Sequence, residues 1–371
     1  MKIAVLTSSR ADFGIYLPLL KTLKADPFFD LEIIAFGTHL SKYHGFTIDE
    51  IKMQGFEIKH QISSLLLTDD PGSISIAYAL TAMRFAELWS WVGNDYDLIF
   101  CLGDRFEMAA AVVAGIPFDL PIVHLYGGET TLGAIDNVFR HTMTLAAKIH
   151  FVSLNEYAVR VSHIIDNSNN IFVIGSLSLE NLSNIELLSM SEFEKKWEID
   201  LNIPSFLVTI HPETVCFLNN TLYAHEAFKA LEYLSIDHQL IITLPNADTS
   251  ATIYREMFNE LKDLKPDRIH LIENFGTQSY FTCMKYVDLI IGNSSSGIVE
   301  AASFNKYVIN IGDRQKGRIS GNNVFHCKFD FSEITNAVKN ALRLESFEEH
   351  NIYFKRNTSK SIVDILKNIE K

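Results

Sequence analysis

The chain has 371 residues, which is too long for one ordinary hydrophobic core, so two domains are expected. Its 32 lysines and arginines stand against 45 acidic residues, and the net charge of −13 argues against a broad surface for nucleic acids or acidic membranes. No apolar run reaches the roughly 18 residues that cross a bilayer, and four scattered cysteines without metal-type spacing suit the reduced thiols of a cytoplasmic protein.

The first half of the chain alternates short apolar runs with helix-like segments. Its first residues become polar too early for a secretory signal, and they are expected to form a core strand. Apolar spacing predicts helices over 14–25 and 73–92. Because runs such as DLIFCL and PIVHLY are apolar throughout, they suit a parallel sheet with both faces buried, and the alternation indicates a doubly wound α/β fold. Strands are expected near residues 2–7, 31–36, 97–102, 120–125 and 149–153.

The same pattern restarts in the second half, where the strand candidates are FLVTIH, QLIITL, RIHLIE, VDLIIG and KYVINIG. Two Rossmann-like domains are therefore expected, over 1–174 and 175–349, with the boundary near 172–184. A last helix, within 350–371, can pack back on the first domain. Since ligands of open α/β sheets bind beyond the carboxyl ends of strands, we expect the site in a cleft between the two domains.

Polar residues follow the first and third predicted strands. The segment TSSRADFG carries Arg10, Asp12 and Gly14 but lacks the GxGxxG spacing of a dinucleotide site, and a capped helix start with an exposed arginine is the alternative. The segment LGDRFEMAA carries Asp104 and Arg105. A strand delivers Asp104 to the ligand-binding edge of the sheet, which favours a functional role over a solvated helix cap.

The next junction, HLYGGETTLGAIDNVFRH, is the densest in ionisable groups. His124, Glu129, Asp136, Arg140 and His141 surround a Gly-Gly turn. A tight turn before a helix would explain the glycines, but so many titratable side chains after a buried strand favour a functional site.

In the second half, TIHPETVC places His211 and Glu213 directly after a strand. A histidine at a strand end is well placed to meet a ligand, and a satisfied structural histidine is the alternative. At VDLIIGNSSSGIVEAASF, Ser294 and Ser295 have two explanations: they cap a helix, or the same turn offers backbone N–H groups to a phosphate.

Three further residues are expected to converge on the pocket at this serine-rich turn. Arg314 of INIGDRQKGR suits bidentate contact with a diphosphate, and Glu300 is placed to accept hydrogen bonds from ribose hydroxyls. Asn246 of LPNADTS completes the set.

A metal site is not expected. The DYD motif at 95–97 looks like a metal-binding DxD, but it precedes its strand and so lies at the wrong end of the sheet, which predicts a turn. The thirteen histidines show neither HxxxH nor HExxH pairing.

Taken in order, these motifs resemble the hydrolysing UDP-N-acetylglucosamine 2-epimerases of sialic acid biosynthesis, both the bacterial enzymes and the epimerase half of the human bifunctional enzyme. The resemblance runs over nearly the whole chain, and the ordered set is far more specific than any one motif. Its segments are SSRADFG, GTHLSKYHGFT, LGDRFE, GGETT…DNVFRH, HPET, PNADTS, IGNSSSGIVE and INIGDRQKGR.

The resemblance implies a glycosyltransferase-B-like fold and conversion of UDP-N-acetylglucosamine to UDP and free N-acetylmannosamine, without metal, nicotinamide or any other cofactor. It implies that Asp104 and Asp136 are catalytic carboxylates, with Glu129 as a third and His211 assisting departure of the diphosphate. The implied contacts to the UDP-sugar are Arg10, Gly14, Arg105, His211, Asn246, Phe275, Ser294, Ser295, Glu300 and Arg314. Tyr126 is a departure, because the human enzyme and some bacterial ones carry glutamate there.

The chemistry expected of such an enzyme begins at carbon 1. The hydrogen on carbon 2 is not acidic until the bond to UDP breaks, after which a general base completes elimination to a glycal. Water then adds across the double bond, with the proton delivered to the opposite face. An alternative substrate is UDP-2,4-diacetamido-2,4,6-trideoxyglucose, on the route to legionaminic acid. A glycosyltransferase of the same fold and a non-catalytic UDP-sugar sensor are alternatives from other classes. Family members are homodimers or homotetramers, and helix 73–92 offers a surface for self-association.

Overall fold

The computed structural model describes residues 1–42, 45–66, 70–245 and 250–369. The chain divides into two compact units. The first comprises Met1–Glu129, Asp136–Asn181 and Tyr353–Lys371, and the second comprises Thr130–Ile135 and Leu182–Ile352. Both are α/β units built on a parallel sheet, which confirms the predicted fold class.

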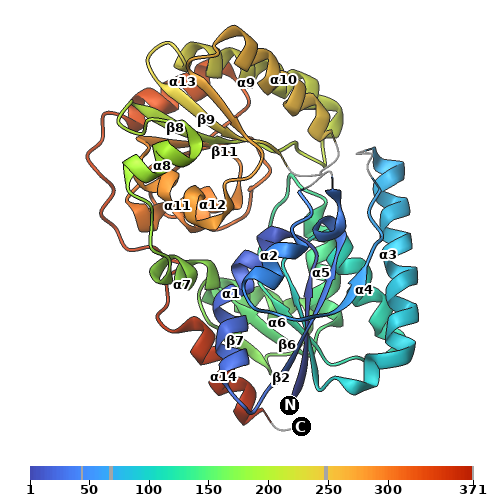
Figure 1. Ribbon diagram of the computed structural model, residues 1–371. Helices are drawn as coiled ribbons and strands as arrows, with labels where there is room; N and C mark the ends of the chain where they lie inside the picture. Colours follow the sequence, from blue (N-terminus) through green and yellow to red (C-terminus); the bar gives the residue numbers. More distant parts are fainter. Residues whose placement is uncertain (43–44, 67–69, 246–249, 370–371) are drawn as a thin grey trace. The chain divides into compact units, whose positions relative to one another are not determined.

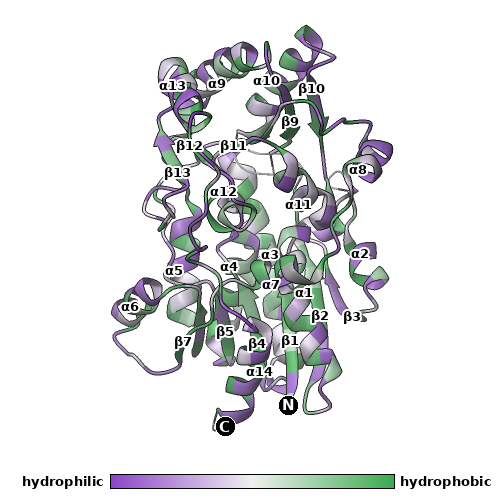
Figure 2. Ribbon diagram, turned by 90° about the vertical axis from the view of Figure 1, so that its left-hand side faces the viewer, coloured by the Kyte–Doolittle hydropathy of each residue, from purple (hydrophilic) through white to green (hydrophobic). Residues whose placement is uncertain are grey.

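The first unit contains a parallel sheet with the order β3-β2-β1-β4-β5-β6-β7. Figure 2 shows its inner strands as largely hydrophobic, and β4 and β5 are buried at every position, as expected for strands covered on both faces. The strands are β1 (Lys2–Thr7), β2 (Asp30–Phe36), β3 (Ile58–Ile62), β4 (Leu98–Leu102), β5 (Ile122–Leu125), β6 (Ile149–Val152) and β7 (Ile171–Val173).

Helices cover this sheet, and their starts follow from local sequence. Asp70 caps α3 by accepting the N–H of Ser73, and Pro71 occupies the first helical position, where its missing N–H costs nothing. Helix α14 returns from the end of the chain to pack against α1 (Figure 1). The helices are α1 (Arg10–Ala25), α2 (Ile48–Met53), α3 (Pro71–Val92), α4 (Phe106–Gly115), α5 (Asp136–Ala146), α6 (Asn155–Ile164), α7 (Leu177–Asn184, which passes into the second unit) and α14 (Thr358–Asn368).

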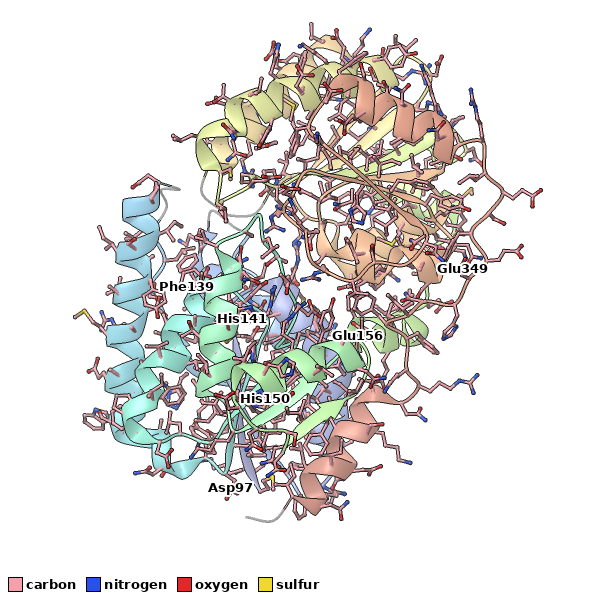
Figure 3. All side chains as sticks on the ribbon, turned by 180° about the vertical axis from the view of Figure 1, so that it is seen from behind. Asp97, Phe139, His141, His150, Glu156 and Glu349 are labelled. Atoms are coloured by element: carbon pink, nitrogen blue, oxygen red, sulfur yellow. The ribbon has the colours of Figure 1, made fainter. Side chains whose placement is uncertain are left out.

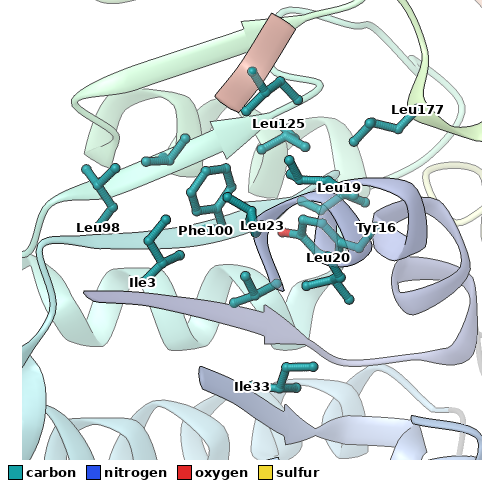
Figure 4. Close-up of a cluster of buried hydrophobic side chains, with 14 of the residues drawn as sticks. Ile3, Tyr16, Leu19, Leu20, Leu23, Ile33, Leu98, Phe100, Leu125 and Leu177 are labelled. Atoms are coloured by element: carbon teal, nitrogen blue, oxygen red, sulfur yellow. The ribbon is translucent and has the colours of Figure 1, made fainter. Parts of the chain in front are cut away.

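The core of the first unit lies between the sheet and these helices. Figure 4 shows Tyr16, Leu19, Leu20 and Leu23 of α1 packed with residues of the neighbouring strands, among them Phe100. The motif DYD lies at the opposite end of β4 from Asp104, because Asp97 precedes the strand and accepts the N–H of Lys2 at 2.8 Å. A turn was predicted there, but Asp95 instead ends a short 3-10 helix over Gly93–Asp95.

The second unit contains a parallel sheet with the order β10-β9-β8-β11-β12-β13. The strands are β8 (Ser205–Thr209), β9 (Gln239–Thr243), β10 (Ile269–Ile272), β11 (Leu289–Gly292), β12 (Val308–Ile311) and β13 (Val324–Cys327). The helices are α8 (Met190–Trp197), α9 (Asn220–Leu234), α10 (Ala251–Leu264), α11 (Gly276–Tyr286), α12 (Ser295–Val299) and α13 (Phe331–Ala341). In both units the candidate residues identified from the sequence lie mostly beyond the carboxyl ends of central strands.

Candidate active site

The junction between β1 and α1 is a helix cap. Ser9 and Asp12 form a capping box, and the Asp12 carboxylate also accepts the N–H of Ser8 at 2.9 Å and its hydroxyl at 2.6 Å. The capped helix start considered from the sequence is therefore confirmed. Arg10 is the first residue of α1 and is half-buried, so the residue lies just beyond the carboxyl end of β1.

His39, which was not among the residues singled out from the sequence, holds the loop after β2 in place. The His39 ring is buried between two hydroxyls, with Nε2 at 2.9 Å from Thr7 Oγ1 and Nδ1 at 2.9 Å from Thr47 Oγ1. Burial lowers the pKa of His39 to about 4, so the ring is neutral near pH 7. Only the spatial pairing of residues 7, 39 and 47 identifies this role, and sequence spacing does not reveal it.

Asp104 and Glu129 are joined through one buried arginine. Arg140, on α5, donates from Nη2 to the Asp104 carboxylate and from Nη1 to the backbone carbonyl of Glu129 at 3.0 Å. The Arg140 side chain is 1% exposed and that of Asp104 is 27% exposed, so the arginine lies behind the aspartate. Arg140 thereby fixes a carboxylate that remains accessible to a ligand.

The Glu129 carboxylate and Asp136 lie near the same corner of the first unit. Glu129 is buried, and its Oε1 accepts a hydrogen bond from Ser153 at 3.1 Å. Asp136 begins α5, one turn before Arg140, and is half-buried. Arg105 instead pairs with the buried Glu107 at 3.0 Å.

His124 has a structural role. Its Nε2 lies 2.9 Å from the carbonyl of Gly103, to which it donates, and its Nδ1 lies 3.2 Å from Thr144 Oγ1. Burial lowers its pKa to about 3. Gly103 has a φ of +74°, so the histidine holds the turn that delivers Asp104. His141 follows Arg140 on α5 (Figure 3), and burial lowers its pKa.

In the second unit, Asn293 fixes the backbone of His211. The His211 N–H donates to Asn293 Oδ1 at 2.7 Å, and Asn293 Nδ2 donates to the His211 carbonyl at 2.9 Å. Asn293 follows β11 directly and is fully buried. The ends of two adjacent strands are thus locked together, and sequence reasoning missed this asparagine because its function depends on a partner 82 residues away.

Glu213 holds the loop that carries Arg314. Its Oε1 accepts the backbone N–H of Asp313 at 2.5 Å, and burial raises the pKa of its carboxyl. Gln315 donates to the carbonyl of Asn293 at 2.9 Å from the other side of Arg314. Arg314 itself is half-buried, so a loop fastened on both sides presents it.

The serine-rich turn makes the helix cap that the sequence allowed. Ser294 is the N-cap of α12, and its hydroxyl oxygen accepts the N–H of Ser296 at 3.4 Å. Ser295 begins the helix, and Glu300 ends it as a buried C-cap residue. Cap formation uses the Ser294 side chain, so a phosphate at this turn would be bound chiefly by backbone N–H groups.

Three candidates remain. The Phe275 ring is buried against Trp197, with ring centroids 4.8 Å apart, so the structure places its side chain in the core. The carbonyl of Gly14 in α1 accepts a hydrogen bond from Asn181 at 3.1 Å. Asn246 lies outside the described residues.

The described ranges lack two features. They contain no group of three or more His, Cys, Asp or Glu side chains that could bind a metal ion. Nor do they contain a helix with the length and hydropathy to cross a membrane. A cavity of about 110 Å³ in the second unit touches α12 at Ile298, beyond the serine turn, and is lined otherwise by Ala302, 320–323, Phe347 and 349–352.

The chain matches the family model described as UDP-N-acetylglucosamine 2-epimerase over residues 21–367. It is 34% identical to a Campylobacter jejuni protein named GDP/UDP-N,N'-diacetylbacillosamine 2-epimerase (hydrolyzing), over 96% of this chain and 89% of the relative. It is 31% identical to polysialic acid biosynthesis protein P7 of Escherichia coli, over 100% of this chain and 94% of the relative. It is 30% identical to a Legionella pneumophila UDP-N,N'-diacetylbacillosamine 2-epimerase (hydrolyzing), over 99% of this chain and 96% of the relative.

Solved structures agree on the fold. The crystal structure of a Neisseria meningitidis UDP-GlcNAc 2-epimerase bound to UDP-GlcNAc superimposes with a TM-score of 0.81 at 15% identity, covering 99% of this chain and all of that one. Two Rossmann-like units of this type define the glycosyltransferase-B-like class of α/β proteins. Within that class, the chain belongs to the UDP-N-acetylglucosamine 2-epimerase family.

Proposed function

We propose that this protein is a hydrolysing 2-epimerase of a UDP-activated 2-acetamido sugar, releasing UDP and the free 2-epimer. The observation that carries the proposal is the joining of Asp104 to Glu129 through the buried Arg140, with Asp136 beginning the same helix as that arginine. Epimerisation at carbon 2 needs groups that remove a proton and return it. The Asp104 carboxylate, held by Arg140, suits that task, and the same arginine fixes the backbone of Glu129.

Departure of UDP requires positive charge and N–H donors at the diphosphate. We assign this task to His211, the Ser294–Ser295 turn and Arg314, assisted by Arg10. The turn and the Arg314 loop converge in the second unit, because Asn293 bonds to His211 and Gln315 bonds to Asn293. The remaining proposed contacts to the nucleotide sugar are Gly14, Arg105, Asn246, Phe275 and Glu300, with the backbone as the only available part of Phe275.

The proposed reaction has two steps that conserve atoms. The bond between carbon 1 and the UDP oxygen breaks with its electron pair going to UDP, a carboxylate removes the proton from carbon 2, and a glycal forms. Water then adds its hydroxyl to carbon 1, and a proton is delivered to carbon 2 from the opposite face. Asp104, Asp136 and Glu129 are the proposed acids and bases, and no cofactor is needed.

Two UDP-activated acetamido sugars are candidate substrates. UDP-N-acetylglucosamine is the expectation from motif order, and N-acetylmannosamine for sialic acid would be its product. UDP-2,4-diacetamido-2,4,6-trideoxyglucose is favoured by two relatives, at 34% and 30% identity, whose names specify diacetylbacillosamine. We propose the diacetamido sugar as the better substrate, in a cytoplasmic route to a legionaminic-type acid.

Self-association is proposed through the outer face of α3. This helix of 22 residues carries only Arg84 and Glu87 as charged residues, and its exposed side chains include Ile76, Met83 and Trp91. An apolar face of this length is typical of an interface between protein chains. We therefore propose a homodimer or homotetramer, which sedimentation of the wild type against a Met83→Glu variant would test.

The direct test of the function is to supply purified protein with each UDP-sugar separately and follow UDP and free sugar by NMR. The proposal predicts UDP release without any acceptor, with a manno-configured free sugar as the other product. A glycosyltransferase would leave the UDP-sugar intact until an acceptor is added. A sensor would bind the nucleotide sugar and release nothing.

A further inference from the structure

The segment Thr130–Ile135 interrupts the first unit at the candidate carboxylates. The residues on either side of it, Glu129 and Asp136, belong to the first unit, whereas the six residues between them pack within the second. We call Thr130–Ile135 the strap. Because the strap is covalently continuous with both carboxylate-bearing residues, whatever holds the strap also constrains them.

The strap is hydrogen-bonded to the two loops proposed to contact the diphosphate. On the Arg314 side, Gly133 donates its N–H to the carbonyl of Asp313 at 3.0 Å, and Leu132 donates to that of Lys316 at 3.0 Å. On the His211 side, the Gly133 carbonyl accepts the N–H of Thr214 at 3.2 Å. The strap therefore lies between the loop after β8 and the loop after β12.

The end of the strap next to Asp136 is held by the side chain of Thr214. Ile135 donates its N–H to Thr214 Oγ1 at 2.9 Å. Thr214 follows Glu213, whose carboxylate fixes Asp313 on the opposite loop at 2.5 Å. The hydroxyl of Thr214 is thus the contact that connects the two diphosphate loops to the residue immediately before Asp136.

The strap packs so closely against the loop after β12 that its position depends on that of the loop. A Cβ atom on Gly133 would lie 2.4 Å from the carbonyl of Asp313, far inside van der Waals contact, so the glycine permits the strap to approach. Thr130 and Thr131 are also buried, and a Cβ atom on Gly317 would lie 2.8 Å from Thr130 Cγ2. A small displacement of the loop after β12 would therefore displace the strap.

We infer that Thr214 is a positioning residue, which uses its hydroxyl to hold Ile135 and through it sets Asp136 according to the state of the diphosphate loops. The inference rests on the proposed function for the assignment of Asp136 and of the diphosphate. Thr214 acts through the strap and touches no reacting atom. Its loss would leave nucleotide binding intact and impair the proton-transfer step.

The test compares Thr214→Val, which keeps the shape but removes the acceptor, with Thr214→Ser, which keeps the hydroxyl. With the UDP-sugar that turns over, Thr214→Val should lose about tenfold or more in kcat, while the Kd for UDP changes by less than about twofold. Thr214→Ser should recover most of the loss. A lower melting temperature for Thr214→Val with unchanged kcat would show a merely structural role and overturn the inference.

A second readout does not depend on turnover. Amide hydrogen exchange at 133–136 should slow when UDP binds to the wild type, and this effect should be lost in Thr214→Val and kept in Thr214→Ser. Equal UDP-dependent protection in wild type and Thr214→Val would overturn the inference even if the protein were catalytically active. Absence of UDP release by the wild type would instead refute the proposed function; the predicted protection pattern would then still show that the Thr214 hydroxyl holds the strap, without a catalytic role for Asp136.

Discussion

The side chain of Asn293 forms hydrogen bonds with both backbone groups of His211, at 2.7 Å to its N–H and at 2.9 Å to its carbonyl. Asn293→Ala would remove both of these hydrogen bonds from buried groups, at about 1–3 kcal/mol for each. We therefore expect the free energy of unfolding to fall by about 2–6 kcal/mol, and the affinity for UDP to fall with it, measured by chemical denaturation and calorimetry.

Asn322→Ala is the matched control for Asn293→Ala. The Asn322 side chain also donates a hydrogen bond, to Glu349 at 2.8 Å, but that bond is exposed to solvent. Its removal should change stability by less than about 0.5 kcal/mol. Equal losses from the two substitutions would show that the Asn293 contacts do not fix His211.

Asp104→Asn should abolish most turnover and spare nucleotide binding. The substitution keeps the shape of the side chain facing Arg140 but removes the negative charge proposed to exchange a proton with the sugar. We expect kcat to fall by about 100-fold or more, with the Kd for UDP within about twofold. Steady-state kinetics and calorimetry measure the two quantities.

The control here is Asp119→Asn. Asp119 also pairs with a cation, Lys148 at 2.8 Å, but its side chain is 91% exposed, and surface pairs contribute little. Its kcat should match that of the wild type. Turnover by Asp104→Asn within about threefold of the wild type would remove Asp104 from the catalytic set.

Acid should destabilise the first unit through its buried histidines. Burial lowers the pKa of His150, on β6 (Figure 3), to about 4, from an ordinary value near 6.5. Between those two values the unfolded chain binds more protons than the folded one, so stability rises with pH across this window and is lost on acidification. The slope is about 1.4 kcal/mol per pH unit for one such histidine.

His150→Phe should therefore flatten the dependence of unfolding free energy on pH between about 4 and 6.5, by the contribution of one histidine. His163 of α6 is exposed, and His163→Asn should leave the dependence unchanged. Denaturation curves at pH 5 and pH 7 measure both. An undiminished slope in His150→Phe would mean that this ring is not held neutral by the fold.

Arg314→Lys should weaken UDP binding by about tenfold, because a lysine cannot reproduce the planar, bidentate contact of a guanidinium with a diphosphate. The exposed Arg343 offers a matched control, for which the same replacement should leave the Kd unchanged. Calorimetric titration with UDP gives both constants. An Arg314→Lys variant that binds UDP as tightly as the wild type would place the diphosphate elsewhere.

The sequence predicts the central strands of both sheets and the edge strand β10, but not the other three edge strands. Strands such as β4 and β8 are buried at every position and read as continuous apolar runs. The edge strands β3, β7 and β13 were missed, because their residues are largely half-exposed and carry no such run. Pairing with a neighbour distant in sequence stabilises them, and a single sequence does not display that pairing.

The site shows the same division between local and distant interactions. Motifs identified Asp104, Glu129 and Arg314, since each lies in the loop after a strand, where ligands of such sheets bind. The interactions that hold these residues were not predictable: Arg140 reaches Asp104 across 36 residues, and Thr214 reaches Ile135 across 79. Sequence patterns therefore identified the candidate catalytic and binding residues, whereas the contacts that position those residues are seen only in the structure.

The central claim, elimination of UDP followed by hydration of a glycal, is tested most directly by turnover in deuterated water. The account predicts that the free sugar carries one deuterium at carbon 2, in the manno configuration, and that UDP appears in equal amount. NMR and mass spectrometry of the product measure both. A product that retains its original hydrogen at carbon 2, or an epimer still attached to UDP, would contradict the account.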